Sequence, residues 1–244
     1  MKKTILILTS IIIALSAFFI TQLDFREEYI PISLFFMIAL CIPTYYYFIK
    51  KTNTKKAIIT IIALSVFSMI IETIGVLTGF PYGFFTYTEK LGTSIGVIPW
   101  TVSFGWVPLV IAAWSLTQEH VKTKKHNLLK KVIIGAFILM IFDVVLDPGS
   151  VAMNFWEWHP EGIFYGVPLS NYAGWIFSGI LGMLIITPIM RDEKPSNDFL
   201  ITAYLGNIFW TMITLMNLMI IPAIVGVIIT IILTKKIFYK NKFG

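Results

Sequence analysis

Charged residues are scarce in this chain, and long apolar runs take their place. Asp, Glu, Lys and Arg make up 13% of the 244 residues, whereas 57% are hydrophobic and the mean hydropathy is +0.82. Soluble domains carry about 25% charged residues. The composition therefore argues against a soluble domain and predicts a single integral-membrane domain over residues 1–244.

Cysteine and the common cofactor motifs are also missing or nearly so. Cys41 is the only cysteine, so an internal disulfide is impossible and a metal site built on cysteine is not expected. The sequence has no Walker loop, no dinucleotide fingerprint and no zinc-helix motif, and no haem or flavin site is evident. We predict that the protein holds no metal and needs no cofactor.

The apolar runs predict an all-α, polytopic bundle of transmembrane helices. A spanning helix needs about 20 mostly apolar residues. Eight segments qualify, at 4–20, 30–49, 57–79, 99–117, 131–147, 171–190, 199–216 and 219–234. The last two come from one long run that Asn217 and Pro222 interrupt, so a count of seven spans is the alternative. The first segment also fits a signal peptide cleaved after Ala17, but the apolar run continues past that point and we expect a retained helix.

Basic residues gather in short clusters between the apolar runs, which explains the net charge of +6 without nucleic-acid binding. With eight spans all five clusters lie on one side, as the positive-inside rule requires. The clusters are Lys2 and Lys3; Lys50, Lys51, Lys55 and Lys56; Lys122, Lys124, Lys125, Lys130 and Lys131; Arg191 and Lys194; and Lys235, Lys236, Lys240 and Lys242. We predict a multi-pass protein of the cell membrane with both termini in the cytoplasm.

Three carboxylates lie inside these apolar spans: Glu72, Asp143 and Asp147. Ionisable groups are costly at membrane depth and by default indicate a functional site. Asp143 and Asp147 are four residues apart and share a helical face. Because Pro148 follows directly, we expect Asp147 at the end of its helix. The alternatives are a protonated packing role for Glu72, a tie to another span for Asp143, a solvated helix end for Asp147, and a divalent cation bound by the two aspartates.

Two aromatic segments rich in Gly and Pro, 79–99 and 148–175, flank the carboxylates and lie on the same outer side of the predicted topology. These two segments fit either interfacial loops of an aromatic belt or re-entrant loops that line a cavity. The number of glycines favours re-entrant loops that wall a site for an apolar substrate. His159 is a candidate proton relay, although a loop histidine is more often solvated.

The residues of this region resemble the CruF-type carotenoid biosynthesis proteins, which include archaeal bisanhydrobacterioruberin hydratase and bacterial gamma-carotene 1'-hydroxylase. The resemblance covers about residues 65–180. It is carried by Glu72, Gly75, Gly79-Phe80-Pro81-Tyr82-Gly83, Tyr87, Leu91-Gly92, Pro99, Trp106, Asp143, Asp147-Pro148, Trp156, Trp158, Gly162, Tyr165-Gly166, Pro168, Asn171 and Gly174-Trp175.

The resemblance implies addition of water to the terminal C=C of an acyclic carotenoid, without a redox cofactor. Such a hydration needs a dry acid, a stabilised tertiary carbocation and a positioned water. We expect Glu72 or Asp143 to be the acid and Asp147 to orient the water. The expected substrate-binding residues are Tyr82, Tyr87, Trp106, Trp156, Trp158, Tyr165, Asn171 and Trp175. The expected partners are an apolar polyene or isoprenoid in the bilayer, the lipid membrane and other membrane enzymes of the carotenoid pathway.

Other functions fit parts of the same pattern. A prenyltransferase would use Asp143 and Asp147 to hold magnesium and a diphosphate, but a second Asp-rich motif is missing and the lysines lie on the opposite side. A cyclase would trap the same carbocation internally. A transporter would use the carboxylates as ion ligands, although no paired repeat is evident. A non-catalytic carotenoid or lipid carrier is the last alternative.

Overall fold

The computed structural model describes residues 3–22, 27–120 and 127–239. Within these ranges the protein is a bundle of eight α-helices, which confirms the predicted fold class. The helices are α1 (Lys3–Ile20), α2 (Ile30–Lys51), α3 (Thr54–Thr78), α4 (Trp100–His120), α5 (Asn127–Ala152), α6 (Leu169–Ile189), α7 (Ile201–Met216) and α8 (Ile220–Phe238). Short 3-10 turns lie at Glu27–Tyr29, Glu89–Leu91 and Asn197–Leu200.

Seven of these helices are long and apolar enough to cross a membrane, judged by length and composition, where α7 is counted together with the 3-10 turn before it. The eighth is α5, which has 26 residues and carries Asp143 and Asp147. Prolines lie inside four helices, at Pro43, Pro108, Pro148 and Pro188. Membrane helices tolerate such prolines because neighbouring groups satisfy the freed backbone carbonyls.

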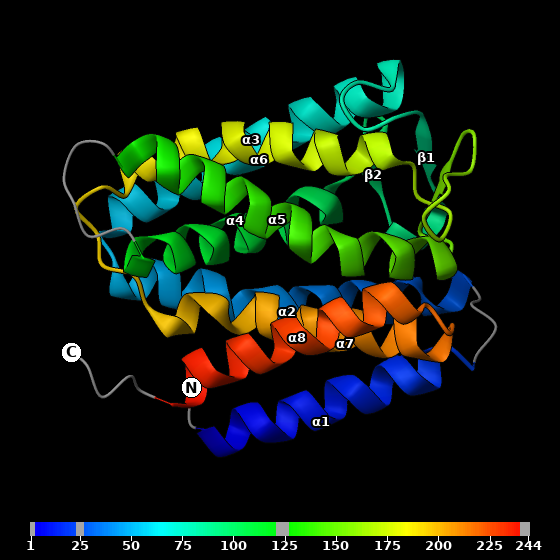
Figure 1. The fold of residues 1–244 in the computed structure, drawn as a ribbon, viewed down its shortest axis with the longest axis horizontal. Coiled ribbons are helices and arrows are strands. Elements are labelled where there is room, and N and C mark those ends of the chain that lie inside the picture. The colour runs from blue at the N-terminus through cyan, green and yellow to red at the C-terminus, as the bar shows by residue number, and fades with distance from the viewer. Residues whose placement is uncertain (1–2, 23–26, 121–126, 240–244) are drawn as a thin grey trace.

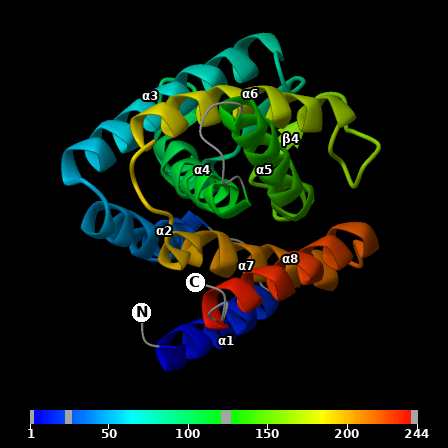
Figure 2. The ribbon, with the colours of Figure 1, turned by 60° about the vertical axis from the view of Figure 1, so that its left-hand side comes forward.

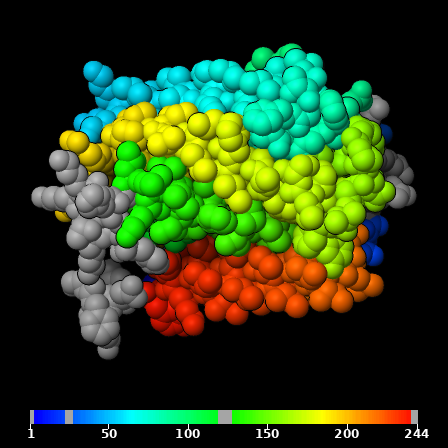
Figure 3. Space-filling view, turned by 45° about the horizontal axis from the view of Figure 1, so that its top comes forward, coloured from blue at the N-terminus to red at the C-terminus, as the bar shows by residue number. Residues whose placement is uncertain are grey.

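Helices α4 and α5 lie in the middle of the bundle (Figure 2). Helices α3 and α6 cover them on one side, and α2, α7 and α8 lie on the other. Helix α1 lies at the edge of the bundle opposite α3 and α6, where it packs against α7 (Figure 1). Figure 3 shows α3, α6, α5 and α8 side by side across one face of the molecule.

One end of the bundle collects basic side chains. Lys51 forms an ion pair with Asp198, and Lys56 lies 3.5 Å from Asp192 and 3.6 Å from Glu193. The two described chain ends meet there, because Lys3 Nζ donates a hydrogen bond of 2.6 Å to the carbonyl of Phe238. The predicted basic residues Lys2, Lys122, Lys124, Lys125, Lys240 and Lys242 lie outside the described residues.

The opposite end carries the two aromatic segments, which pair with each other. Strand β1 (Phe85–Tyr87) is antiparallel to β4 (Trp156–Trp158), with Phe85 opposite Trp158 and Tyr87 opposite Trp156. A second small sheet joins β2 (Ser94–Ile95) to β3 (Ile98–Pro99). Backbone pairing thus fixes the two segments at one end of the bundle (Figure 1). Their rings pack in one cluster with Ile71 of α3, Val151 of α5 and Tyr172 of α6.

The prediction that a helix ends at Asp147 is wrong. Helix α5 continues through Pro148 to Ala152. Proline removes one backbone donor and disfavours helix at the preceding residue, but it does not forbid it. The chain after Pro148 keeps its own hydrogen bonds, from Met153 N to Gly149 O at 3.1 Å and from Phe155 N to Ser150 O at 3.0 Å. Asp147 therefore faces the bundle interior from within a helix.

Candidate functional site

A buried pair of carboxylates lies at the centre of the site. Asp143 and Asp147, on α5, are 1% and 2% exposed. Between them lies the amide of Asn171, in the first turn of α6, which begins after Pro168. Asn171 Nδ2 donates one hydrogen bond to Asp143 Oδ2 at 2.7 Å and another to Asp147 Oδ2. Because the carboxylate oxygens accept these two hydrogen bonds, the side-chain nitrogen of Asn171, and not its oxygen, must face the aspartates.

The two carboxylates differ in their remaining oxygens. Asp147 Oδ1 accepts a hydrogen bond from the indole Nε1 of Trp156, at the start of β4. Asp143 Oδ1 is buried and has no hydrogen-bond partner among the described residues. Burying a polar atom without a partner costs free energy. A proton on Asp143 Oδ1 would therefore meet no competing donor, whereas both oxygens of Asp147 already face N–H groups.

Glu72, on α3, is buried beside the pair but has a different partner. Its Oε2 accepts a hydrogen bond of 2.7 Å from the hydroxyl of Tyr87, on β1. Glu72 is 6% exposed and does not line the cavity described below. The contact ties the β1–β4 sheet to α3.

Asp143 and Asp147 lie on the wall of a cavity of about 730 Å³. Small-molecule sites typically enclose about 300–1,000 Å³, lined mainly by apolar and aromatic groups. Seven of the eight predicted substrate-binding residues line it: Tyr82, Tyr87, Trp106, Trp156, Trp158, Asn171 and Trp175. The eighth, Tyr165, does not. Its ring packs on Phe164 and its hydroxyl accepts a hydrogen bond from Ile221 N at 3.4 Å.

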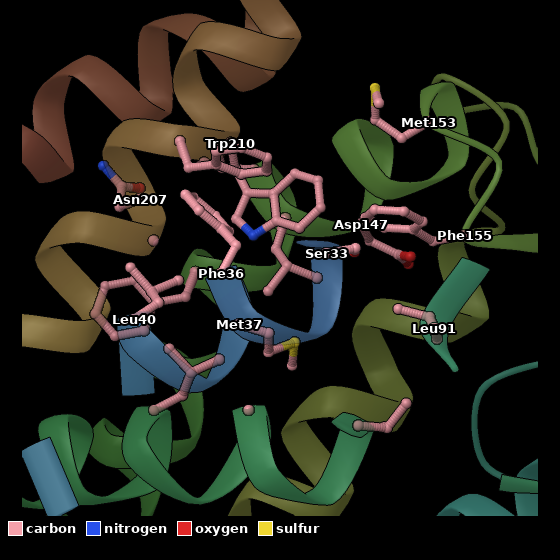
Figure 4. Close-up of a pocket in the computed structure, with 18 of the residues that line it drawn as sticks. Ser33, Phe36, Met37, Leu40, Leu91, Asp147, Met153, Phe155, Asn207 and Trp210 are labelled. Atoms are coloured by element: carbon pink, nitrogen blue, oxygen red, sulfur yellow. The ribbon is translucent and has the colours of Figure 1, made fainter. Parts of the chain in front are cut away.

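Much of the remaining wall comes from helices to which the sequence assigned no role. Figure 4 shows Phe36, Met37 and Leu40 of α2 and Trp210 of α7 around the cavity, with Asp147 on the side opposite Leu40. Helix α1 also contributes, from Ile12 to Ile20. Most of these side chains are apolar, as in any membrane span, so the sequence does not mark them as cavity residues. Asn207 is a polar residue inside the α7 span, and it could have indicated that α7 lines a cavity.

Glycines allow the aromatic segment to approach the helices closely. A Cβ added at Gly174 would lie 2.5 Å from Tyr82 Cδ1, and one added at Gly75 would lie 2.9 Å from Tyr82 Cδ2. Tyr82 is therefore held between α3 and α6 and is only 3% exposed. This packing fixes the aromatic wall next to the carboxylates.

Other candidate groups lie outside this arrangement. His159 Nε2 is 3.0 Å from Thr86 Oγ1 on the surface, and it does not line the cavity. Among residues 3–22, 27–120 and 127–239, no three His, Cys, Asp or Glu side chains gather as metal ligands. The cavity wall itself offers two carboxyl groups, the amides of Asn171 and Asn207, several hydroxyl groups, one thiol and several aromatic rings.

The chain is similar to known proteins over most of its length. Residues 29–233 match the family described as carotenoid biosynthesis protein. Bisanhydrobacterioruberin hydratase of Haloarcula japonica is 38% identical over 133 residues, a match that covers 54% of this chain and 45% of that relative. The match thus spans less than half of the relative's length, and no solved structure matches. The family and the apolar helices together describe a multi-pass membrane protein. The matched region covers most of the chain, and the protein belongs to the carotenoid biosynthesis protein family.

Proposed function

We propose that the protein is a membrane hydratase that adds water to the terminal C=C of an acyclic carotenoid or a related isoprenoid. The observation that carries the proposal is the Asp143–Asp147 pair, buried on the wall of an apolar cavity and bridged by Asn171. The similarity to a hydratase named for a bisanhydrobacterioruberin substrate supports the same reaction class.

Asp143 is the proton donor in this mechanism. Its Oδ1 carries the proton, because that oxygen meets no N–H group in the described structure. Two carboxylates this close repel each other when both are charged, so the pair retains one proton. Transfer of that proton to the less substituted alkene carbon breaks the O–H and π bonds and forms a C–H bond. A tertiary carbocation remains on the neighbouring carbon.

Asp147 then orients the water. The hydrogen bonds from Trp156 and Asn171 fix its carboxylate in place. As the water oxygen bonds to the cationic carbon, one water proton passes to the Asp147 carboxylate. The product is a tertiary alcohol, and the pair again holds one proton. That proton returns to Asp143 through cavity water before the next turnover.

The aromatic wall stabilises the cation. Ring faces attract positive charge through their quadrupole, by about 0.5–2 kcal/mol per contact. Tyr82, Trp156 and Trp158 line the same cavity as the carboxylates. Glu72 is outside that lining, and we assign it a positioning role, since it holds Tyr87 and the β1–β4 sheet.

The test is expression in a host that accumulates lycopene or bisanhydrobacterioruberin, followed by chromatography and mass spectrometry of the pigments. A hydratase gives products heavier by one water per modified end, with tertiary alcohols. Asp143→Asn and Asp147→Asn abolish these products, whereas a mere carotenoid carrier still binds pigment with both substitutions. Unchanged pigment with both polyenes, with the protein present in the membrane, would contradict the proposal.

A further inference from the structure

The side chains that line the cavity are exposed on one side of it and buried on the other. Among the described residues that line it, only Ile12, Leu15, Phe19 and Ile32 are more than half exposed, at 61%, 52%, 59% and 65%. All four come from α1 and α2. The cavity is therefore open on the side where these two helices lie, and we call these four residues the mouth.

The opposite side of the cavity is closed. Asp143, Asp147, Asn171, Tyr82 and Trp106 are each 6% exposed or less. They come from α4, α5 and α6 and from the aromatic segment that packs on these helices. A molecule that enters through the mouth therefore meets the carboxylates at the end of its path.

The chemistry of the mouth indicates what it faces. Its four side chains are all apolar, and both helices are long and apolar enough to span a membrane. In the described structure, the carboxylates of Asp143 and Asp147 are the only Asp, Glu, Lys or Arg side chains on the cavity wall. An exposed apolar opening of this kind suits contact with lipid chains better than contact with water. The described wall also offers no Lys or Arg to a diphosphate group.

We propose that the mouth between α1 and α2 admits the substrate end sideways from the bilayer. The unreacted hydrocarbon tail then stays in the mouth, against Leu15 and Ile32, while the end group reacts at the carboxylates. The inference rests on the proposed function for the class of substrate, an acyclic isoprenoid. A chain longer than the cavity can react in this way without being enclosed completely.

The attachment of α1 suits this role. Ile13 and Ala17 of α1 are buried in a cluster with α7, and Ser10 Oγ donates a hydrogen bond of 3.4 Å to the hydroxyl of Tyr204. Helix α1 is thus held along α7, while Leu15 and Phe19 remain exposed beside the opening. Leu8 offers a matched control, since it lies on the same helix, is 55% exposed and does not line the cavity.

Photo-cross-linking tests the path without requiring turnover. A phenylalanine that carries a trifluoromethyl-diazirine group is placed at position 15 or at position 8 in cells that accumulate lycopene. After irradiation, the purified protein is examined by mass spectrometry for covalently attached polyene. We expect attachment at position 15 and little at position 8. Equal attachment at both positions, or none at position 15, would overturn the proposal.

A blocking substitution tests the same path by activity. Leu15→Trp is expected to lower the yield of hydrated product about tenfold, whereas Leu8→Trp leaves it near wild type at equal membrane levels. Wild-type yield from a Leu15→Trp protein would contradict the proposal. If that variant is missing from the membrane, the cross-linking result decides.

The two experiments separate this inference from the proposed function. Cross-linking at position 15 alone, in a protein that leaves every tested polyene unhydrated, supports the mouth and contradicts the hydratase. Hydrated product without cross-linking at position 15 supports the hydratase and contradicts the mouth.

Discussion

The side-chain amide of Asn171 donates a hydrogen bond of 2.7 Å to Asp143 while its second N–H reaches Asp147. A single neutral group thus holds two buried carboxyl groups from adjacent turns of α5. This bridge from the first turn of α6 sets the spacing of the pair. It also leaves one carboxyl oxygen, Oδ1 of Asp143, without a partner among the described residues.

Replacing the Asn171 bridge should slow the reaction strongly. Asn171→Leu keeps similar volume but removes both donors, so the two carboxyl groups lose their fixed spacing. We expect hydrated product to fall about 100-fold, by analogy with the loss of one preorganised donor in an active site. Pigment analysis at matched protein levels measures it. Asn197→Leu is the control, because Asn197 bonds to Lys236 at the other end of the bundle. If the Asn171→Leu protein forms as much hydrated product as the wild type, the Asn171 bridge is not needed for the reaction.

The two aspartates should differ in their effect on stability. In Asp147→Asn, the new amide faces the N–H groups of Trp156 and Asn171, so one donor must oppose another. In Asp143→Asn, the amide nitrogen can take the position of Oδ1, where no donor lies. We expect the Asp147→Asn protein to be about 1–3 kcal/mol less stable to unfolding than the Asp143→Asn protein, although both variants are inactive. Thermal unfolding in detergent measures this difference, and equal midpoints would contradict the assigned hydrogen bonds.

Glu72 provides a test of which carboxyl group donates the proton. Glu72→Gln can still accept the hydrogen bond from Tyr87 through its amide oxygen, so we expect it to retain most of its activity. Glu72→Leu leaves the Tyr87 hydroxyl buried without an acceptor, at a cost of about 1–3 kcal/mol, and loses activity through the displaced sheet. Pigment yield and thermal stability are measured together. A stable but inactive Glu72→Gln protein would make Glu72 the acid in place of Asp143.

The sequence predicted the helices well because apolar length and flanking lysines are strong local signals. The predicted spans 57–79 and 171–190 correspond to Thr54–Thr78 and Leu169–Ile189 in the structure. The predicted end of α5 was wrong because the bias against helical conformation in a residue before proline is only a local preference. In α5 the hydrogen bonds of the following turn outweigh it.

Most residues of the candidate site were predicted from the sequence, but the shape of the cavity was not. Seven predicted binding residues line the cavity, since buried carboxylates and aromatic segments stand out in an apolar chain. The pairing of Phe85 with Trp158 could not be predicted, because it joins strands far apart in the sequence that have no periodic pattern. The walls from α1, α2 and α7 were missed because a cavity-facing leucine and a lipid-facing leucine look alike in sequence.

The close contact of Gly174 with Tyr82 gives a last prediction. A Cβ at Gly174 would lie 2.5 Å from Tyr82 Cδ1 and 2.9 Å from the carbonyl oxygen of Pro81, so the aromatic segment must move away from α6. Overpacking of this kind costs about 1–3 kcal/mol. We expect Gly174→Ala to lower the unfolding midpoint and to reduce product, since Tyr82 belongs to the cavity wall. For stability the control is Gly206→Ala, whose Cβ would meet Leu40 Cδ2 at an ordinary 3.8 Å. If both alanine variants unfold at the same temperature, Tyr82 is not held by the contact with α6.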